Sequence, residues 1–97
     1  MSAVPPPAEV PAHGLLAGKS VLITAAAGGG IGFAAARRCL QEGARGVVLS
    51  DMHPRRTAEA AAALAEQFPD REVYGQVCNV TVEDEVQALV ETAEARL

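Results

Sequence analysis

The sequence predicts a doubly wound α/β fold with a parallel sheet, truncated after six elements in the order β-α-β-α-β-α. Three short apolar runs, at 19–24, 47–51 and 72–80, have the length and composition of buried strands. Between and after these runs lie segments in which apolar residues recur at helical spacing. Strands that alternate with helices through short connections are typical of parallel sheets with right-handed crossovers.

The first strand, 19–24, leads through a glycine-rich loop into a predicted helix over 30–42. Gly43 stands where a helix often ends in a left-handed residue. The second strand, 47–51, is followed by Pro54, which suits the first position of a helix. The alanine-rich segment after it has high helix propensity and is expected to continue to Phe68.

The third strand, 72–80, precedes the last predicted helix. Thr81 and Asp84 have the spacing of a capping box, in which a threonine and an acid three residues later bond each other's backbone N–H groups. Val86, Leu89 and Val90 mark the apolar face of this helix. Residues 15–97 are therefore expected to form the folded domain.

Residues 1–14 differ from the remainder in composition. Four of the six prolines of the chain lie among the first eleven residues. Proline lacks the N–H group that a sheet needs and interrupts helices. We expect a flexible or polyproline-like tail here.

Composition excludes several classes of protein. The chain has 97 residues, a net charge of −4 and no basic block, which argues against binding to nucleic acid. Its apolar runs fall short of the about 20 residues that a membrane-spanning helix needs, and no signal peptide is evident. Cys39 and Cys78 are far apart and form no CxxC motif. We expect no metal site and a cytoplasmic location.

The loop TAAAGGGIG, residues 24–32, predicts an anion-binding site. The N-terminus of a helix has free N–H groups and a partial positive charge, and glycine lets a phosphate approach the backbone closely. Asp51 ends the second strand 19 residues after Gly32, a spacing that suits a carboxylate on ribose hydroxyls. The alternatives are a purely structural turn for the glycines and a turn-capping role for the carboxylate.

The segment LAGKSVLITAAAGGGIGFAAARRCLQEGA resembles the N-terminus of the short-chain dehydrogenase/reductase family, whose members carry T-G-x-x-x-G-x-G. Thr24 and the sequence Gly30-Ile31-Gly32 match this motif, and VVLSD resembles the second strand with its acidic end. VCNVT, residues 77–81, is similar to the family's D-V at the adenine site. The resemblance covers residues 15–97 and implies a Rossmann-type fold that binds NAD, with NADP as the alternative.

Two positions depart from the family pattern. The loop is one residue longer, and its first glycine is replaced by Ala25 or Ala26. Alanine is tolerated there only if its φ stays negative, so we expect Gly28 and Gly29 to adopt the strained angles. Asn79 replaces an aspartate; its side-chain oxygen could accept a hydrogen bond from the adenine amino group, or form a strand-end Asx turn.

The resemblance implies a cofactor site formed by the glycine loop and the ends of the second and third strands. Asp51 would accept hydrogen bonds from both ribose hydroxyls of NAD and would repel the 2′-phosphate of NADP. Arg55 and Arg56 are close enough in sequence to offer that phosphate a counter-charge. The predicted cofactor-binding residues are Ala26, Gly28, Gly29, Gly30, Ile31, Gly32, Asp51, Met52, Asn79 and Val80.

No catalytic residues are expected in this chain. The family resemblance implies a Tyr-x-x-x-Lys pair, but Tyr74 is followed four residues later by Cys78, and the one lysine is Lys19. We therefore expect the cofactor-binding part of an NAD(P)-dependent oxidoreductase for carbonyl or alcohol substrates, inactive by itself. The alternative is a non-catalytic nucleotide-binding or interaction module, or a truncated remnant.

Two further expectations follow from the resemblance. The family's strand order leaves the first strand at a sheet edge, so we expect the isolated chain to self-associate through it. The loop, with GLLAGK before it, is similar to members that reduce acyl-thioester or steroid-like ketones.

Overall fold

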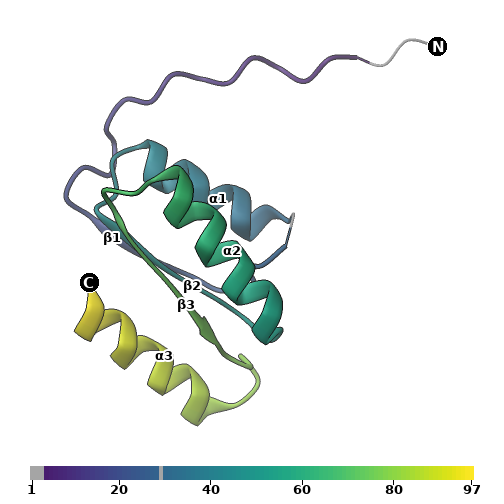
Figure 1. Ribbon diagram of the computed structural model, residues 1–97, viewed down its shortest axis with the longest axis vertical. Coiled ribbons are helices and arrows are strands. Elements are labelled where there is room, and N and C mark those ends of the chain that lie inside the picture. The colour runs from purple at the N-terminus through teal and green to yellow at the C-terminus, as the bar shows by residue number, and fades with distance from the viewer. Residues whose placement is uncertain (1–3, 29) are drawn as a thin grey trace.

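A computed structural model describes residues 4–28 and 30–97 of the chain. It contains three parallel strands and three helices in strict alternation, which confirms the predicted α/β order (Figure 1). The elements are β1 (Ser20–Ile23), α1 (Ile31–Gln41), β2 (Gly46–Asp51), α2 (Pro54–Gln67), β3 (Glu72–Val77) and α3 (Glu83–Arg96).

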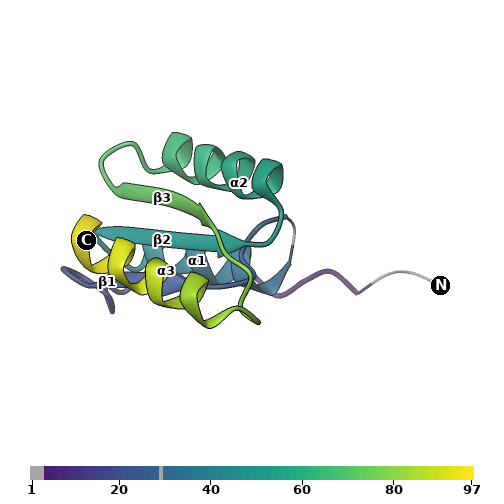
Figure 2. The same ribbon diagram turned by 90° about the horizontal axis from the view of Figure 1, so that it is seen from below.

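The sheet has the order β1-β2-β3, so β2 is the central strand. Its side chains alternate between the two faces. Val47 and Leu49 pack with Leu40 and Leu64 of α1 and α2, whereas Val48 packs on the opposite face with residues of α3. The resulting three layers place α1 and α2 on one face of the sheet and α3 on the other (Figure 1), and α3 lies nearest the viewer in Figure 2.

The third strand is shorter than predicted and ends at Val77. The backbone N–H of Cys78 still donates to the carbonyl of Asp51, at 3.0 Å, and the chain then turns at Asn79. The turn closes through a 3.0 Å bond from the N–H of Val82 to the carbonyl of Asn79. Residues 79 and 80 therefore belong to a loop at the end of the sheet.

The predicted capping box between Thr81 and Asp84 is wrong. Helix α3 begins after Val82, which has no side-chain cap. The Thr81 hydroxyl donates instead to Asn79 Oδ1, at 2.6 Å. The acid that reaches back is Glu85, which accepts a hydrogen bond from the N–H of Asn79 at 3.1 Å. The side-chain oxygen of Asn79 competes successfully for the threonine, which moves the start of the helix one residue later.

The N-terminal segment, from residue 4, lacks regular secondary structure and passes the C-terminal end of α1 (Figure 1). Two side chains bind its backbone: Arg38, which lies in α1, and Glu42, which is the C-cap of α1. Arg38 donates to the carbonyl of Val10 at 2.8 Å, and Glu42 accepts from the N–H groups of His13 and Leu15 at 2.8 and 3.2 Å. Arg38 and Glu42 also form a 2.7 Å ion pair.

Candidate nucleotide-binding site

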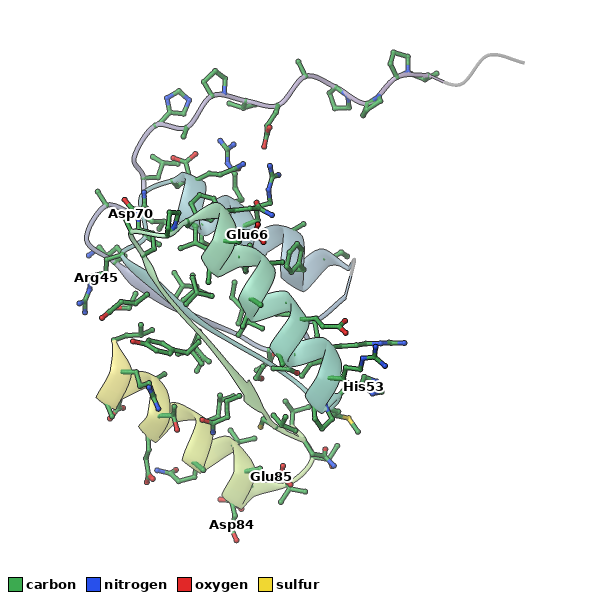
Figure 3. All side chains as sticks on the ribbon, in the orientation of Figure 1. Arg45, His53, Glu66, Asp70, Asp84 and Glu85 are labelled. Carbon is green, nitrogen blue, oxygen red and sulfur yellow. The ribbon has the colours of Figure 1, made fainter. Side chains whose placement is uncertain are left out.

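The carboxyl ends of the three strands meet at one edge of the sheet, and all three helices begin there. Figure 3 labels His53 and Glu85 at this end of the molecule and Arg45 and Asp70 at the opposite end. In open parallel sheets, ligands bind in the crevice outside the carboxyl ends of the strands. The loops at this edge, the last residue of β2 and the first turn of α1 contain the described residues that the sequence predicted as cofactor-binding.

The loop after β1 turns sharply at Ala25, whose φ is +54°. The expectation that alanine would keep a negative φ here is therefore wrong. The next residue explains the turn: Ala26 is fully buried, and its N–H donates to the carbonyl of Ser50 at 3.0 Å. Burying Ala26 beside β2 requires the chain to reverse at Ala25, in a region that favours glycine.

Further along the loop, Gly28 has a φ of +85°, as predicted. Gly29 lies outside the described residues. Gly30 is the N-cap of α1, with an ordinary φ of −89°. The strained angles are thus at Ala25 and Gly28 among the residues that the structure describes in this loop.

Helix α1 begins directly above the loop and packs closely against it at Gly32. A Cβ atom on Gly32 would collide with the carbonyl oxygen of Ala25 and would lie 2.9 Å from Ala26 Cα. The first helical bond joins the N–H of Ala34 to the carbonyl of Gly30 at 3.2 Å. The N–H groups of residues 31–33 therefore precede the helical ladder and are free to bind an anion.

Asp51 joins the end of β2 to this loop. Its Oδ2 accepts from the N–H of Ala27 at 3.3 Å, and its Oδ1 from the N–H of Met52 at 2.7 Å. Burial raises the pKa of the carboxyl, but the N–H groups of Ala27, Met52 and His53 outweigh it and hold the pKa below its ordinary value. Asp51 is therefore ionised at neutral pH and has acceptor positions left for hydroxyl groups.

The two arginines after β2 have different surroundings. Arg55 forms a 3.0 Å ion pair with Glu59 on the exposed side of α2. Arg56 lines a groove of about 320 Å³ between the glycine loop and α2, together with Gly28 and Phe33. Only Arg56 of this pair borders the loop.

Three predicted residues form an exposed apolar rim around the site. Ile31, Met52 and Val80 follow β1, β2 and β3 respectively, and their exposed fractions are 90%, 57% and 57%. Ala26, in contrast, is buried and supports the loop from beneath.

Asn79 is half-buried, and its hydrogen bonds form an Asx turn. Its Oδ1 accepts from both the N–H and the hydroxyl of Thr81, at 3.0 and 2.6 Å. Both acceptor positions of this oxygen are therefore occupied. An asparagine at the end of a strand is typical of such a turn, so this turn could be expected from the sequence. The bond from the Ala27 N–H to Asp51 could not be predicted from any pattern in the sequence.

Tyr74 and Lys19 lie away from the site. Tyr74 lies in β3, and the guanidinium of Arg96 stacks on its ring at 4.9 Å from the centroid. Lys19 directly precedes β1, so it lies at the amino ends of the strands, opposite the candidate site. The two residues do not form a pair for proton transfer.

The family model described as short chain dehydrogenase matches residues 19–97. The chain belongs to this family. A reductase of Mycobacterium tuberculosis, named for (5R,7aS)-5-hydroxy-7a-methyl-1-oxo-2,3,5,6,7,7a-hexahydro-1H-indene-carboxyl-CoA, is 52% identical over 91 residues, which cover 94% of this chain and 34% of the reductase. The chain thus spans about a third of that relative.

Solved structures of the family have the same fold. A short chain dehydrogenase from Mycobacterium smegmatis matches with a TM-score of 0.84 and 49% identity, over 90% of this chain and 35% of that one. L-sorbose reductase from Gluconobacter frateurii, complexed with NADPH and L-sorbose, matches at 0.73 and 33%, over 82% and 29%. A family member from Burkholderia phymatum in complex with NAD matches at 0.73 and 31%, over 84% and 27%.

These matches confirm the Rossmann-type fold and the family resemblance. The family is one of oxidoreductases that bind nicotinamide cofactors, and its solved members hold NADPH in some cases and NAD in others. Within residues 4–28 and 30–97, no helix has the length and apolar character needed to cross a membrane.

Proposed function

We propose that this chain is the part of an NAD(P)-dependent oxidoreductase that holds the adenosine and diphosphate of the cofactor. The complete protein would transfer hydride between the nicotinamide and a carbonyl or alcohol substrate. The observation that carries the proposal is the close packing of Gly32 on the loop after β1, which opens the N-terminus of α1 beside the ionised Asp51.

In this proposal each loop binds one part of the cofactor. The diphosphate accepts hydrogen bonds from the N–H groups at the start of α1, where the absence of side chains on Gly28 and Gly30 lets it approach. The adenosine ribose donates its hydroxyls to Asp51. The adenine ring lies against the rim formed by Ile31, Met52 and Val80, with Asn79 at its edge.

We favour NAD over NADP. A 2′-phosphate would lie against the carboxylate of Asp51, whose low pKa keeps it charged. Arg55 is already paired with Glu59, which weakens it as a counter-charge. Arg56, beside Gly28, is the residue that would support NADP.

For the complete protein we propose a coenzyme A thioester of a fused-ring ketone or alcohol as the substrate class. The support is the 52% identity, over nearly all of this chain, with the indene-carboxyl-CoA reductase. The assay measures whether the complete protein uses NADH or NADPH to reduce the ring ketone of such a coenzyme A thioester. L-sorbose is the comparison substrate.

The cofactor assignment is tested by titrating the chain with NAD and NADP. We expect NAD to bind more tightly. A hydrogen bond to a charged group contributes about 1.5–3 kcal/mol, so Asp51→Ala should weaken NAD binding by roughly one to two orders of magnitude. Asp70→Ala, at the opposite end of the molecule, is the control and should bind NAD as the wild type does. An Asp51→Ala variant with unchanged affinity would contradict the assignment.

A further inference from the structure

We infer that Asn79 presents a hydrogen-bond donor to the base of the bound nucleotide, so that this site does not select the 6-amino group of adenine. The inference rests on the proposed function, because it concerns the base of the same cofactor. It reverses the role expected from the sequence, in which the side-chain oxygen of Asn79 accepts from that amino group.

The first argument is that the oxygen of Asn79 is saturated. An amide oxygen has two lone pairs, and Thr81 uses both, through its N–H at 3.0 Å and its hydroxyl at 2.6 Å. A hydroxyl at 2.6 Å from an amide oxygen must donate its proton to it. These two bonds also fix which end of the amide is oxygen, because the backbone N–H of Thr81 can only donate.

The second argument is that the turn holds Asn79 in place. Its backbone N–H donates to Glu85 Oε1 at 3.1 Å, and its carbonyl accepts from the N–H of Val82 at 3.0 Å. The side-chain oxygen, the N–H and the carbonyl of Asn79 are thus all bound within the loop. In the part of the chain that the structure describes, the Nδ2 amino group has no hydrogen-bond partner, and it is the one polar group of Asn79 left for a ligand.

The third argument places a base at this residue. Asn79 follows Cys78, whose N–H bonds to the carbonyl of Asp51 at 3.0 Å, so the loop after β3 lies beside the end of β2. A nucleotide whose ribose binds Asp51 therefore carries its base toward residues 79 and 80. Val80 offers an exposed apolar surface there.

The chemistry of the base follows from this geometry. The edge of adenine offers an amino donor at position 6 and acceptor ring nitrogens, whereas hypoxanthine offers a carbonyl acceptor at position 6. An amino group such as Nδ2 finds an acceptor on either base. An aspartate at position 79 would keep one oxygen on Thr81 and place the other where Nδ2 lies, so it would accept from the adenine amino group and repel the hypoxanthine carbonyl.

The test compares NAD with nicotinamide hypoxanthine dinucleotide, in which the amino group is replaced by a carbonyl. Dissociation constants for both are measured by calorimetric titration of the wild-type chain, Asn79→Asp and Gln67→Glu. The last variant makes the same amide-to-carboxylate change at the C-terminal end of α2, near the opposite edge of the sheet. It therefore controls for the added charge.

We expect the wild type and Gln67→Glu to bind the two dinucleotides within about threefold of each other. Asn79→Asp should favour NAD by about tenfold or more, because the new carboxylate accepts a hydrogen bond from the 6-amino group of adenine. A wild type that already prefers NAD tenfold, or an Asn79→Asp variant whose preference does not change, would overturn the inference and leave the proposed function standing. Failure of the wild type to bind either dinucleotide would overturn both.

Discussion

The Oδ2 oxygen of Asp51 lies 3.3 Å from the backbone nitrogen of Ala27, and this contact joins the end of β2 to the loop after β1. The residue proposed to bind ribose therefore also holds the loop proposed to bind phosphate in position. The two alternatives drawn from the sequence, ribose contact and turn capping, do not exclude each other. Removing the carboxylate should affect the folded chain even without nucleotide.

Replacing Asp51 should therefore lower the free energy of unfolding of the free chain. Asp51→Ala removes the acceptor of the N–H groups of Ala27 and Met52, and because water can reach the exposed Met52 N–H, the expected cost is about 0.5–1.5 kcal/mol. Asp51→Asn keeps one acceptor oxygen and should cost less. Urea unfolding followed by circular dichroism measures both changes. Asp70→Ala, whose side chain is 77% exposed, should stay within about 0.5 kcal/mol of wild type.

The loop also contains a conformational strain that a single substitution should relieve. Ala25 adopts a φ of +54°, where an L-residue with a Cβ costs roughly 1–2 kcal/mol relative to glycine. Glycine relieves this strain, but it also increases the conformational entropy of the unfolded chain, which offsets part of the stabilisation. We expect Ala25→Gly to stabilise the chain by about 0.5–1 kcal/mol in urea unfolding. Ala35→Gly, within α1, should destabilise it by a similar amount. A destabilised Ala25→Gly variant would show that the turn at this residue is not as described.

Alanine substitutions at Gly32 and Gly30 should have different effects, one on the stability of the chain and the other on its affinity for NAD. Gly32→Ala places a methyl group against the backbone of Ala25 and Ala26, so it should destabilise the chain by several kcal/mol, in the range of overpacked or strained sites. Gly30→Ala meets no atom within 4 Å and has a negative φ. Its stability should therefore change little.

The same Gly30→Ala variant should bind NAD more weakly, because its new methyl group occupies the space that the diphosphate approaches. Unfolding and NAD titration, performed on both variants, measure the two effects. If Gly30→Ala bound NAD with wild-type affinity, the diphosphate would have to lie elsewhere.

Glu42 should make the attachment of the N-terminal segment sensitive to acid. The N–H groups of His13 and Leu15 lower the pKa of this carboxyl, burial opposes them, and Arg38 lowers it further. Since the pKa is lower in the folded chain, the stabilisation is present above the unfolded value of about 4.3 and is lost as the pH falls through the folded value.

We therefore expect the amide signals of His13 and Leu15 to keep their hydrogen-bonded shifts at neutral pH and to lose them in the acid range below the unfolded value of Glu42. Glu42→Ala, which removes both acceptor oxygens, should show the released shifts already at neutral pH. Glu66→Ala, which removes an exposed carboxyl of α2, is the matched control and should keep the wild-type profile. Shifts in wild type that do not change over this range would contradict the attachment.

The order and type of the elements could be predicted because they depend on local patterns. The apolar run VVLS, the alanine-rich segment after Pro54 and the glycine loop each specify one structure. The details that failed depend on competition between neighbours. Thr81 had a capping acid at the right spacing, but Asn79 offered a closer oxygen. Ala25 was expected to avoid a positive φ, but burial of Ala26 beneath Ser50 required it.

The outer edge of β1 should make the isolated chain self-associate. No described residue pairs with that side of the strand, and a groove of about 350 Å³ lies beside it, lined by Leu22, Val90 and Leu97 among others. An unpaired apolar edge is a template for pairing with another chain. We expect light scattering after size exclusion to report a mass above that of one chain. Leu22→Lys should lower it, because a charge on an edge strand opposes pairing, whereas Val10→Lys, in the N-terminal segment, should not. A wild-type chain that elutes as a monomer and melts in one sharp transition would mean that β1 and its groove are stable when exposed to water.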